Sequence, residues 1–287
     1  MDAALARRLH RSIEPYHALI YFAPEAIEGA KALGLKGYWM GYFATRAAPM
    51  GPVAPAVVTA TFYNFKPAVV QRAIPDAWSF APAETCLAFR YEAADAALRR
   101  LLGDEVVGGD EVKQAAELAL EAAAACDTVG RPLAAAWQAV PVPTEPHLAL
   151  WHAATVLREH RGDGHLAALV DAELDGCQVH VTFAGTGQIG REVLQGTRGW
   201  SDDEWDAAVA GLQARGWVTA DGALTAEGAA RRQAVEDRTD ELALGPYRAL
   251  GAERTARLHE LTRPLAIAIA KAGGVPMPNP MGAPEPE

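Results

Sequence analysis

Cysteine is scarce in this chain of 287 residues. Its three cysteines, Cys86, Cys126 and Cys177, lie far apart and form no CxxC pair. This distribution excludes a disulfide framework and the paired spacing of zinc-finger ligands. No basic start followed by an apolar run is present, so we expect a reduced, cytoplasmic protein. No uncharged apolar stretch is long enough to span a bilayer, and we expect no membrane partner.

Positive charge is also scarce: 26 Lys and Arg stand against 36 Asp and Glu, a formal net charge of -10. An acidic chain is repelled by phosphate backbones and by anionic membranes. Familiar catalytic motifs are missing as well. Gly185, Gly187 and Gly190 match the spacing of GxGxxG, but no βαβ unit surrounds them. The sequence contains no Walker loop, GxSxG elbow or HExxH, and therefore indicates no established class of catalysis.

What the sequence does contain is a set of ordered internal matches. Tyr16-His17-Ala18 recurs as Trp151-His152-Ala153, and Arg131-Pro132-Leu133-Ala134 recurs as Arg263-Pro264-Leu265-Ala266. The offsets drift only between about 132 and 140 residues, which is typical of a tandem duplication with short loop insertions. We predict one copy over 1–143, a second over 144–272, and a Pro/Gly-rich tail over 273–287 that is disordered or lies on the surface.

The pattern of apolar residues predicts helices in both copies. In the first, Pro15 should end a helix over 2–13, helices should follow over 56–62 and from Asn64 to 74, and 86–91 has strand character. In the second, helices are expected over 148–159, 165–174 and 187–194, with a charged loop over 158–165. Ser201 should cap a helix ending at 215, a short β-hairpin should cover 217–225, and helices over 226–244 and 252–272 should close the chain.

The stretch EWDAAVAGLQARGWVTADGALTAEGAARRQAVEDRTDELA resembles the recognition-helix, wing and long-helix segment of MarR-type regulators. The whole chain is similar to a family of duplicated helix-turn-helix proteins labelled SalK-like. The resemblance implies a mainly α fold with short β-hairpins, in which two winged helix-turn-helix repeats form an intramolecular pseudo-dimer. It also implies ligand pockets where the terminal helices meet the winged-helix lobes, and no further oligomer is required.

The resemblance would place the helix over 201–215 in the major groove of DNA. That helix instead carries Asp202, Asp203, Glu204 and Asp206 in its first turns. Carboxylates at this place repel phosphates, so we expect the winged helix to be a scaffold without specific DNA binding.

His17 and His152 occupy matching positions in the two copies, each directly after an aromatic residue. If they converge near a pseudo-twofold axis, they could bind a metal, ligate a haem or transfer protons. The alternative is two ordinary helix histidines with local partners. Glu159, His160, Asp163 and His165, in the charged segment of the second copy, are candidate acid/base groups or metal ligands, although their spacing matches no established motif. Here the alternative is a solvated loop.

A dense aromatic set marks the first copy. Trp39, Tyr42, Tyr63 and Phe65, with Arg46 and Asn64 among them and Trp151 beside His152, could form an apolar wall for a planar organic ligand, Arg46 pairing with its carboxylate or phenolate. The alternative is that the rings fill the core.

These features together predict binding of a small, partly aromatic organic molecule in the cavity between the two domains, without specific DNA binding. An enzyme converting such a molecule there, with a metal or haem as cofactor, is the second hypothesis, and a MarR-like transcriptional regulator is the third.

Overall fold

The structure is a computed structural model that describes residues 3–276, 278–279, 281–282 and 286. The tail predicted over 273–287 is therefore described only in part, and its residues 277, 280, 283–285 and 287 lie outside the described residues. None of the helices in the described ranges combines the length and apolar character needed to cross a membrane.

The first half of the chain forms a series of helices of very different lengths. They are α1 (Ala3–Ala18), η1 (Leu19–Tyr21), α2 (Pro24–Ala32), α3 (Gly37–Ala47), η2 (Ala48–Met50), α4 (Pro55–Phe62), α5 (Pro67–Gln71), α6 (Ala77–Phe80), α7 (Ala83–Leu102), α8 (Asp104–Val107), α9 (Asp110–Ala124) and α10 (Pro132–Gln138). Proline occupies the first turn of several of them, where its missing N–H costs no hydrogen bond and its fixed φ suits a helix.

The second half contains the longest helix of the described chain. Its helices are α11 (Pro146–Asp171), α12 (Gly176–Ala184), α13 (Arg191–Arg198), α14 (Asp202–Ala214), α15 (Ala226–Leu242), α16 (Gly245–Leu250) and α17 (Ala252–Lys271). The predicted caps are confirmed: Ser201 forms a capping box with Glu204 on α14, and Thr225 accepts from Gly228 N at the start of α15. The predicted closing helix is α17.

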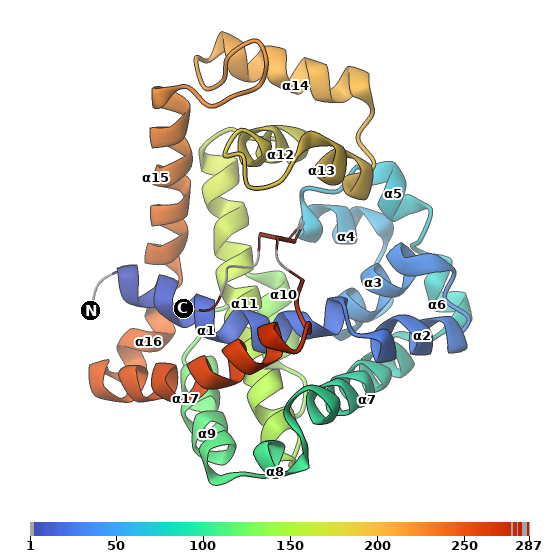
Figure 1. Cartoon of the computed structure of the whole chain (residues 1–287). Coiled ribbons are helices and arrows are strands. Elements are labelled where there is room, and N and C mark those ends of the chain that lie inside the picture. The colour runs from blue at the N-terminus through green and yellow to red at the C-terminus, as the bar shows by residue number, and fades with distance from the viewer. Residues whose placement is uncertain (1–2, 277, 280, 283–285, 287) are drawn as a thin grey trace.

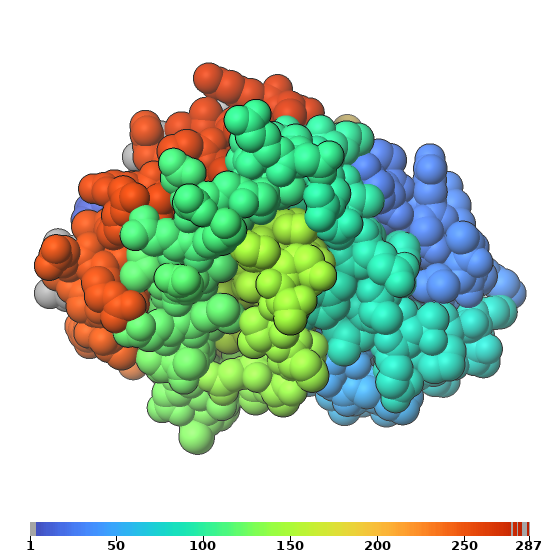
Figure 2. Space-filling view, turned by 90° about the horizontal axis from the view of Figure 1, so that it is seen from below, coloured from blue at the N-terminus to red at the C-terminus, as the bar shows by residue number. Residues whose placement is uncertain are grey.

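Helix α11 is the central column of the molecule (Figure 1), and α1, α7, α9, α10 and α15 pack against it. Seen from below, the yellow-green segment around the start of α11 lies enclosed between the green side of α9 and the teal side of α7 (Figure 2). This enclosure buries most of α11 on more than one face, including the polar side chains of His152, Thr155, Glu159 and His160. A helix that is buried all round must satisfy its polar groups by partners from its neighbours.

Two hydrophobic clusters hold the chain together. The larger takes residues from 6 to 157 and again from 243 to 275, and the smaller takes residues from 168 to 235. The smaller cluster is the core of a lobe formed by α12, α13 and α14, which lies at the C-terminal end of α11 in Figure 1.

The predicted fold of winged-helix repeats with short β-hairpins in a pseudo-dimer is wrong. The described residues form helices and contain no β-strand; where a hairpin was expected, a single antiparallel bridge joins Val218 and Leu224. Only a few residues flank the Asp221–Gly222 turn before Thr225 becomes the cap of α15, so the pairing cannot extend. The larger cluster also draws on both expected copies, so two winged-helix lobes clasping each other are not seen.

Three local predictions fail for a common reason. Pro15 lies inside α1, residues 86–91 lie inside α7 and not in a strand, and the charged stretch 158–165 continues α11 without a loop. Pro15 and the stretch 158–165 look irregular by composition and 86–91 looks like a strand, but packing against neighbouring helices stabilises helical structure in each case.

Candidate functional site

A network of buried charged side chains joins α1, α3 and α11. The Arg46 guanidinium donates two hydrogen bonds to the Glu159 carboxylate, Nε to Oε1 at 3.1 Å and Nη2 to Oε2 at 2.9 Å. Arg158 Nη1 donates to the same Oε2 at 2.7 Å, and its Nε lies 3.5 Å from Glu14 Oε1. Although burial alone would raise the pKa of the Glu159 carboxyl, Arg158 and Arg46 hold it below its ordinary value. Burial raises the pKa of Glu14, against the influence of Arg158.

His17 lies next to this network. Its Nδ1 is 2.9 Å from Thr155 Oγ1, its Nε2 is 3.0 Å from the Tyr21 hydroxyl, and its ring stacks on Trp151 at a centroid distance of 6.1 Å. Trp151 Nε1 in turn donates to the His17 carbonyl at 3.3 Å. Burial lowers the pKa of His17 well below its ordinary value, so the ring is neutral at physiological pH, with both nitrogens engaged.

His152 occupies a different environment. Its Nδ1 is 2.7 Å from the Tyr91 hydroxyl, and its ring packs against Tyr91 and Trp137. Burial lowers its pKa to about 4. The structure thus places the two matching histidines, on α1 and α11, among different hydrogen-bond partners.

The other candidates on α11 diverge from Glu159. Asp163 Oδ2 accepts from the backbone N–H groups of Leu133 and Ala134 at the start of α10, and burial raises its pKa to about 6. His165 Nδ1 lies 2.8 Å from Thr239 Oγ1 on α15, and burial lowers its pKa. His160 is buried, with a pKa lowered to about 4, and its carbonyl accepts from Arg131. Across the described ranges no group of three or more His, Cys, Asp or Glu could hold a metal ion.

The aromatic residues divide into two groups. Trp39, Tyr42 and Phe65 pack with Phe43 and Phe62, and Arg46 lies over the Phe62 ring at 4.4 Å. Tyr63 and Asn64 face the α12–α14 lobe instead: the Tyr63 hydroxyl donates to the Leu174 carbonyl, and the Asn64 carbonyl accepts from His180 Nε2 and Trp200 Nε1, each at 3.1 Å.

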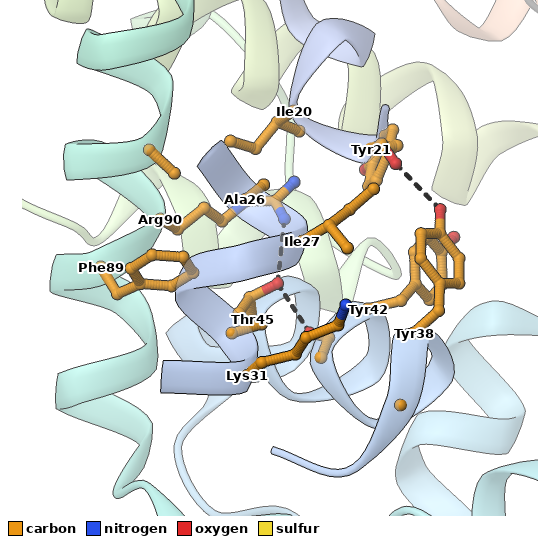
Figure 3. A pocket seen from close by; sticks show the side chains of 14 residues that line it. Ile20, Tyr21, Ala26, Ile27, Lys31, Tyr38, Tyr42, Thr45, Phe89 and Arg90 are labelled. Atoms are coloured by element: carbon orange, nitrogen blue, oxygen red, sulfur yellow. Dashed lines mark hydrogen bonds between the residues drawn. The ribbon is translucent and has the colours of Figure 1, made fainter. Parts of the chain in front are cut away.

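Tyr42 also borders a cleft, which lies between η1, α2, α3 and α7 (Figure 3). It encloses ≈ 490 Å³ of space between atoms, including solvent at its mouth, and the centres of water molecules can occupy ≈ 40 Å³ within it. Fourteen residues line it: Ile20, Tyr21, Ala26, Ile27, Ala30, Lys31, Gly37, Tyr38, Gly41, Tyr42, Thr45, Phe89, Arg90 and Ala93.

Sequence reasoning missed the central residue of this cleft, Arg90. It is buried, its Nη1 donates to Thr45 Oγ1 at 3.3 Å, and its guanidinium lies over the rings of Tyr21, Trp137 and Trp151 at 5.2 to 5.7 Å. A signal was present: Cys86, Arg90, Ala93 and Ala97 recur at helical spacing, which puts an arginine on an apolar helix face. Because a strand was predicted over 86–91, this helical spacing was not recognised.

The α12–α14 lobe carries its charges at the start of α14. Arg191 pairs with Asp202 at 2.9 Å and Asp206 at 2.8 Å, and Lys66 reaches Glu204 across from the first half at 2.7 Å. Asp202, Asp203 and Asp206 are exposed, so the first turns of α14 present carboxylates to solvent.

The model of a helix-turn-helix family matches residues 6–276 of the chain. No significant match was found among curated proteins or solved structures. Since the family match covers nearly the whole sequence, the chain belongs to this helix-turn-helix family.

Proposed function

We propose that the protein binds a small, partly aromatic organic molecule in the cleft between η1, α2, α3 and α7. The observation that carries this proposal is the lining of the cleft. Rings of Tyr21, Tyr38, Tyr42 and Phe89 form apolar walls around a buried polar group, the Arg90 guanidinium. Mostly apolar walls with a few placed polar groups are the usual composition of a small-molecule site.

The room in the cleft sets the size of the ligand. The ≈ 40 Å³ that admits water is enough for a few waters or one small functional group. A ring must therefore occupy the outer part of the cleft and displace side chains there. Lys31 is exposed at the border of the cleft, and Tyr38 is held there by one hydrogen bond, from its hydroxyl to the Tyr21 carbonyl at 3.0 Å, which a ligand would have to displace. The ligand is accordingly of the size of a single substituted ring.

The Arg46–Glu159 pair and the neighbouring His17 support two walls of this cleft from behind. Arg46 Nη1 donates to the Tyr42 hydroxyl at 2.7 Å, and Tyr21 bonds to His17, so two of the ring walls are fixed by buried hydrogen bonds. Rigid walls reduce the cost of ordering on binding. We assign the site to this cleft and not to a seam between the two copies because its lining lies entirely within residues 20–93. The second hypothesis, an enzyme acting through the histidines and α11 carboxylates, stays a prediction.

Native mass spectrometry of freshly purified protein tests the proposal directly, because a retained ligand adds its mass to the chain. The matched variant is Ile27→Trp, which enlarges a half-buried residue of the lining and narrows the cleft. We expect this variant to lose the added mass and the thermal stabilisation by ligand that the wild type shows. The control is Val57→Trp, at an exposed position on α4 outside the lining. Equal ligand retention in Ile27→Trp and wild type would refute this location of the site.

Family membership favours a second candidate, a DNA-binding regulator, and the finer resemblance of 187–244 to MarR-type proteins belongs with it. The exposed carboxylates of α14 oppose it, because they would face phosphates in a major groove. A mobility-shift assay with DNA from the protein's own locus, at about 50 and 200 mM salt, separates the two candidates. A sequence-selective, salt-dependent shift would establish the regulator; we expect none.

A further inference from the structure

One edge of the Arg90 guanidinium has nothing to bond to. The residue is 2% exposed, and its Nη1 is the atom that reaches Thr45. Within the part of the chain that the structure describes, its Nε and Nη2 are buried and have no hydrogen-bond partner. Buried polar groups of proteins are nearly always bonded, and charged ones are the most costly to leave unpaired. The free edge therefore indicates that an acceptor from outside the chain binds there.

The same chain shows what this edge binds when it is satisfied. Arg46 uses its Nε and Nη2 to hold both oxygens of Glu159, at 3.1 and 2.9 Å. Nε and Nη2 form one side of the planar guanidinium, and their parallel N–H bonds match the two oxygens of a carboxylate. Arg90 offers the identical pair of donors, and no carboxylate of the described residues lies on them.

The charges nearby leave Arg90 uncompensated. Glu159 is shared by Arg46 and Arg158, and Glu14 pairs with Arg158. Two further carboxylates are buried in the described residues, and both are engaged elsewhere: Asp163 accepts from backbone N–H groups of α10, and Asp240 pairs with Arg161. The rings around Arg90 attract its positive charge, but a ring face is only a weak acceptor and does not replace an oxygen on the N–H groups of the guanidinium. As far as the described residues go, the cleft lining itself contains two cations, Lys31 and Arg90, and neither Asp nor Glu.

We propose that Arg90 binds the carboxylate of a small aromatic acid, one oxygen on Nε and the other on Nη2, with the ring of the acid against Tyr21, Tyr38, Tyr42 and Phe89. Lys31, at the exposed border of the cleft, adds long-range attraction for the anion. This inference rests on the proposed function and narrows its ligand class. It assigns to Arg90 the pairing role that the sequence suggested for Arg46, whose guanidinium the protein already neutralises with Glu159.

Isothermal titration with matched acids and amides tests the inference. The probes are benzoate and phenylacetate, and their neutral counterparts benzamide and phenylacetamide. We expect the wild type to bind at least one acid about tenfold or more tightly than its amide, as a bidentate charged pair requires. Arg90→Lys should weaken binding of that acid about tenfold and leave the amide unchanged, because an ammonium cannot make two parallel bonds. Arg72→Met, at an exposed arginine outside the lining, is the control and should bind like the wild type.

The ligand-free stability of Arg90→Met gives a second readout. A binding residue that is unpaired without its ligand should be replaceable by methionine with an unchanged or raised Tm, whereas a structural arginine would lower it. Equal affinity for acid and amide, no binding of either acid, or a wild-type response from Arg90→Lys would each overturn the assignment of Arg90. None of these results would refute the proposed function. That function is tested separately, by whether the wild type retains a ligand mass that Ile27→Trp loses.

Discussion

At the residue scale, Glu159 is the carboxylate on which two buried guanidiniums depend. It is 1% exposed and bonds to both Arg46 and Arg158. We expect Glu159→Gln to lower the free energy of unfolding by about 3–5 kcal/mol, because it leaves two cations without their shared partner. Urea denaturation measures this difference.

The control for Glu159→Gln is the same change at Glu241. Its pair with Arg238 spans 2.8 Å, but both side chains are 56% exposed, so its loss should cost roughly 0–1 kcal/mol. If the two substitutions cost the same, the Glu159 network would not be the buried unit described above.

His152 supplies a pH dependence at the same scale. Burial lowers its pKa to about 4, so between pH 6.5 and about 4 the unfolded chain binds a proton that the folded chain does not. The contribution of neutral His152 to the free energy of unfolding is thus complete above pH 6.5 and is lost as the pH falls towards 4. We expect His152→Asn, which keeps an acceptor for Tyr91, to reduce the slope of unfolding free energy against pH in this range by up to about 1.4 kcal/mol per unit. An unchanged slope, measured by urea denaturation at several pH values, would contradict this account.

Of the candidate site residues selected from the sequence, Tyr42 lines the proposed cleft, and the role of the others stays a prediction. Arg46 bonds to both Glu159 and Tyr42, and His17 lies next to them, but the sequence could not tell which cation is already paired. The ion pair joins Arg46 and Glu159, which lie 113 positions apart, so no local sequence pattern can predict it. Arg90 escaped notice because its role depends on the absence of such a partner.

At the element scale, α11 shows why composition misleads. Glycines and charges over 158–165 are typical of a loop, yet three of the polar side chains find partners on neighbouring helices: Arg161 on Asp240, His165 on Thr239, Asp163 on the start of α10. These bonds and the enclosure of α11 outweigh the weak helix propensity of Gly162 and Gly164.

The two glycines give opposite predictions for this continuous helix. A Cβ at Gly162 meets ordinary contacts, Glu159 Oε2 at 3.4 Å, so Gly162→Ala should stabilise by about 0.5–1 kcal/mol. A Cβ at Gly164 lies 2.7 Å from Arg131 Nη1, which is held by the His160 carbonyl, so Gly164→Ala should destabilise by about 1–3 kcal/mol. Thermal unfolding of the pair measures the contrast; equal effects would indicate a flexible loop at this place.

At the scale of the whole molecule, the helical character, the order of most helices and the caps of α14 and α15 could be predicted from periodicity and capping residues. The arrangement of the halves could not. Matching residues such as His17 and His152 suggested symmetry, but their partners come from different helices, Tyr21 next to α1 and Tyr91 on α7. Packing of one core by residues from both ends of the chain is a long-range property that internal matches do not encode.

A short strap, Tyr63 to Lys66, carries several of the contacts between the α12–α14 lobe and the first half. Tyr63 bonds to the Leu174 carbonyl, Asn64 accepts from His180 and Trp200, and Lys66 pairs with Glu204. Gly176, the first residue of α12, approaches this strap so closely that a Cβ would lie 2.5 Å from the Tyr63 carbonyl oxygen. A backbone atom cannot yield as a flexible side chain can, so any side chain at this position must push the lobe and the strap apart.

We therefore expect Gly176→Ala to loosen the lobe as a unit. Hydrogen exchange should accelerate across α12, α13 and α14 while α7 and α9, in the larger cluster, keep their protection. Gly196→Ala is the matched control, because a Cβ there meets nothing within 4 Å, and it should leave exchange unchanged or slower. Acceleration spread evenly over both clusters would mean that lobe and bundle open together, and that the strap is not where they separate.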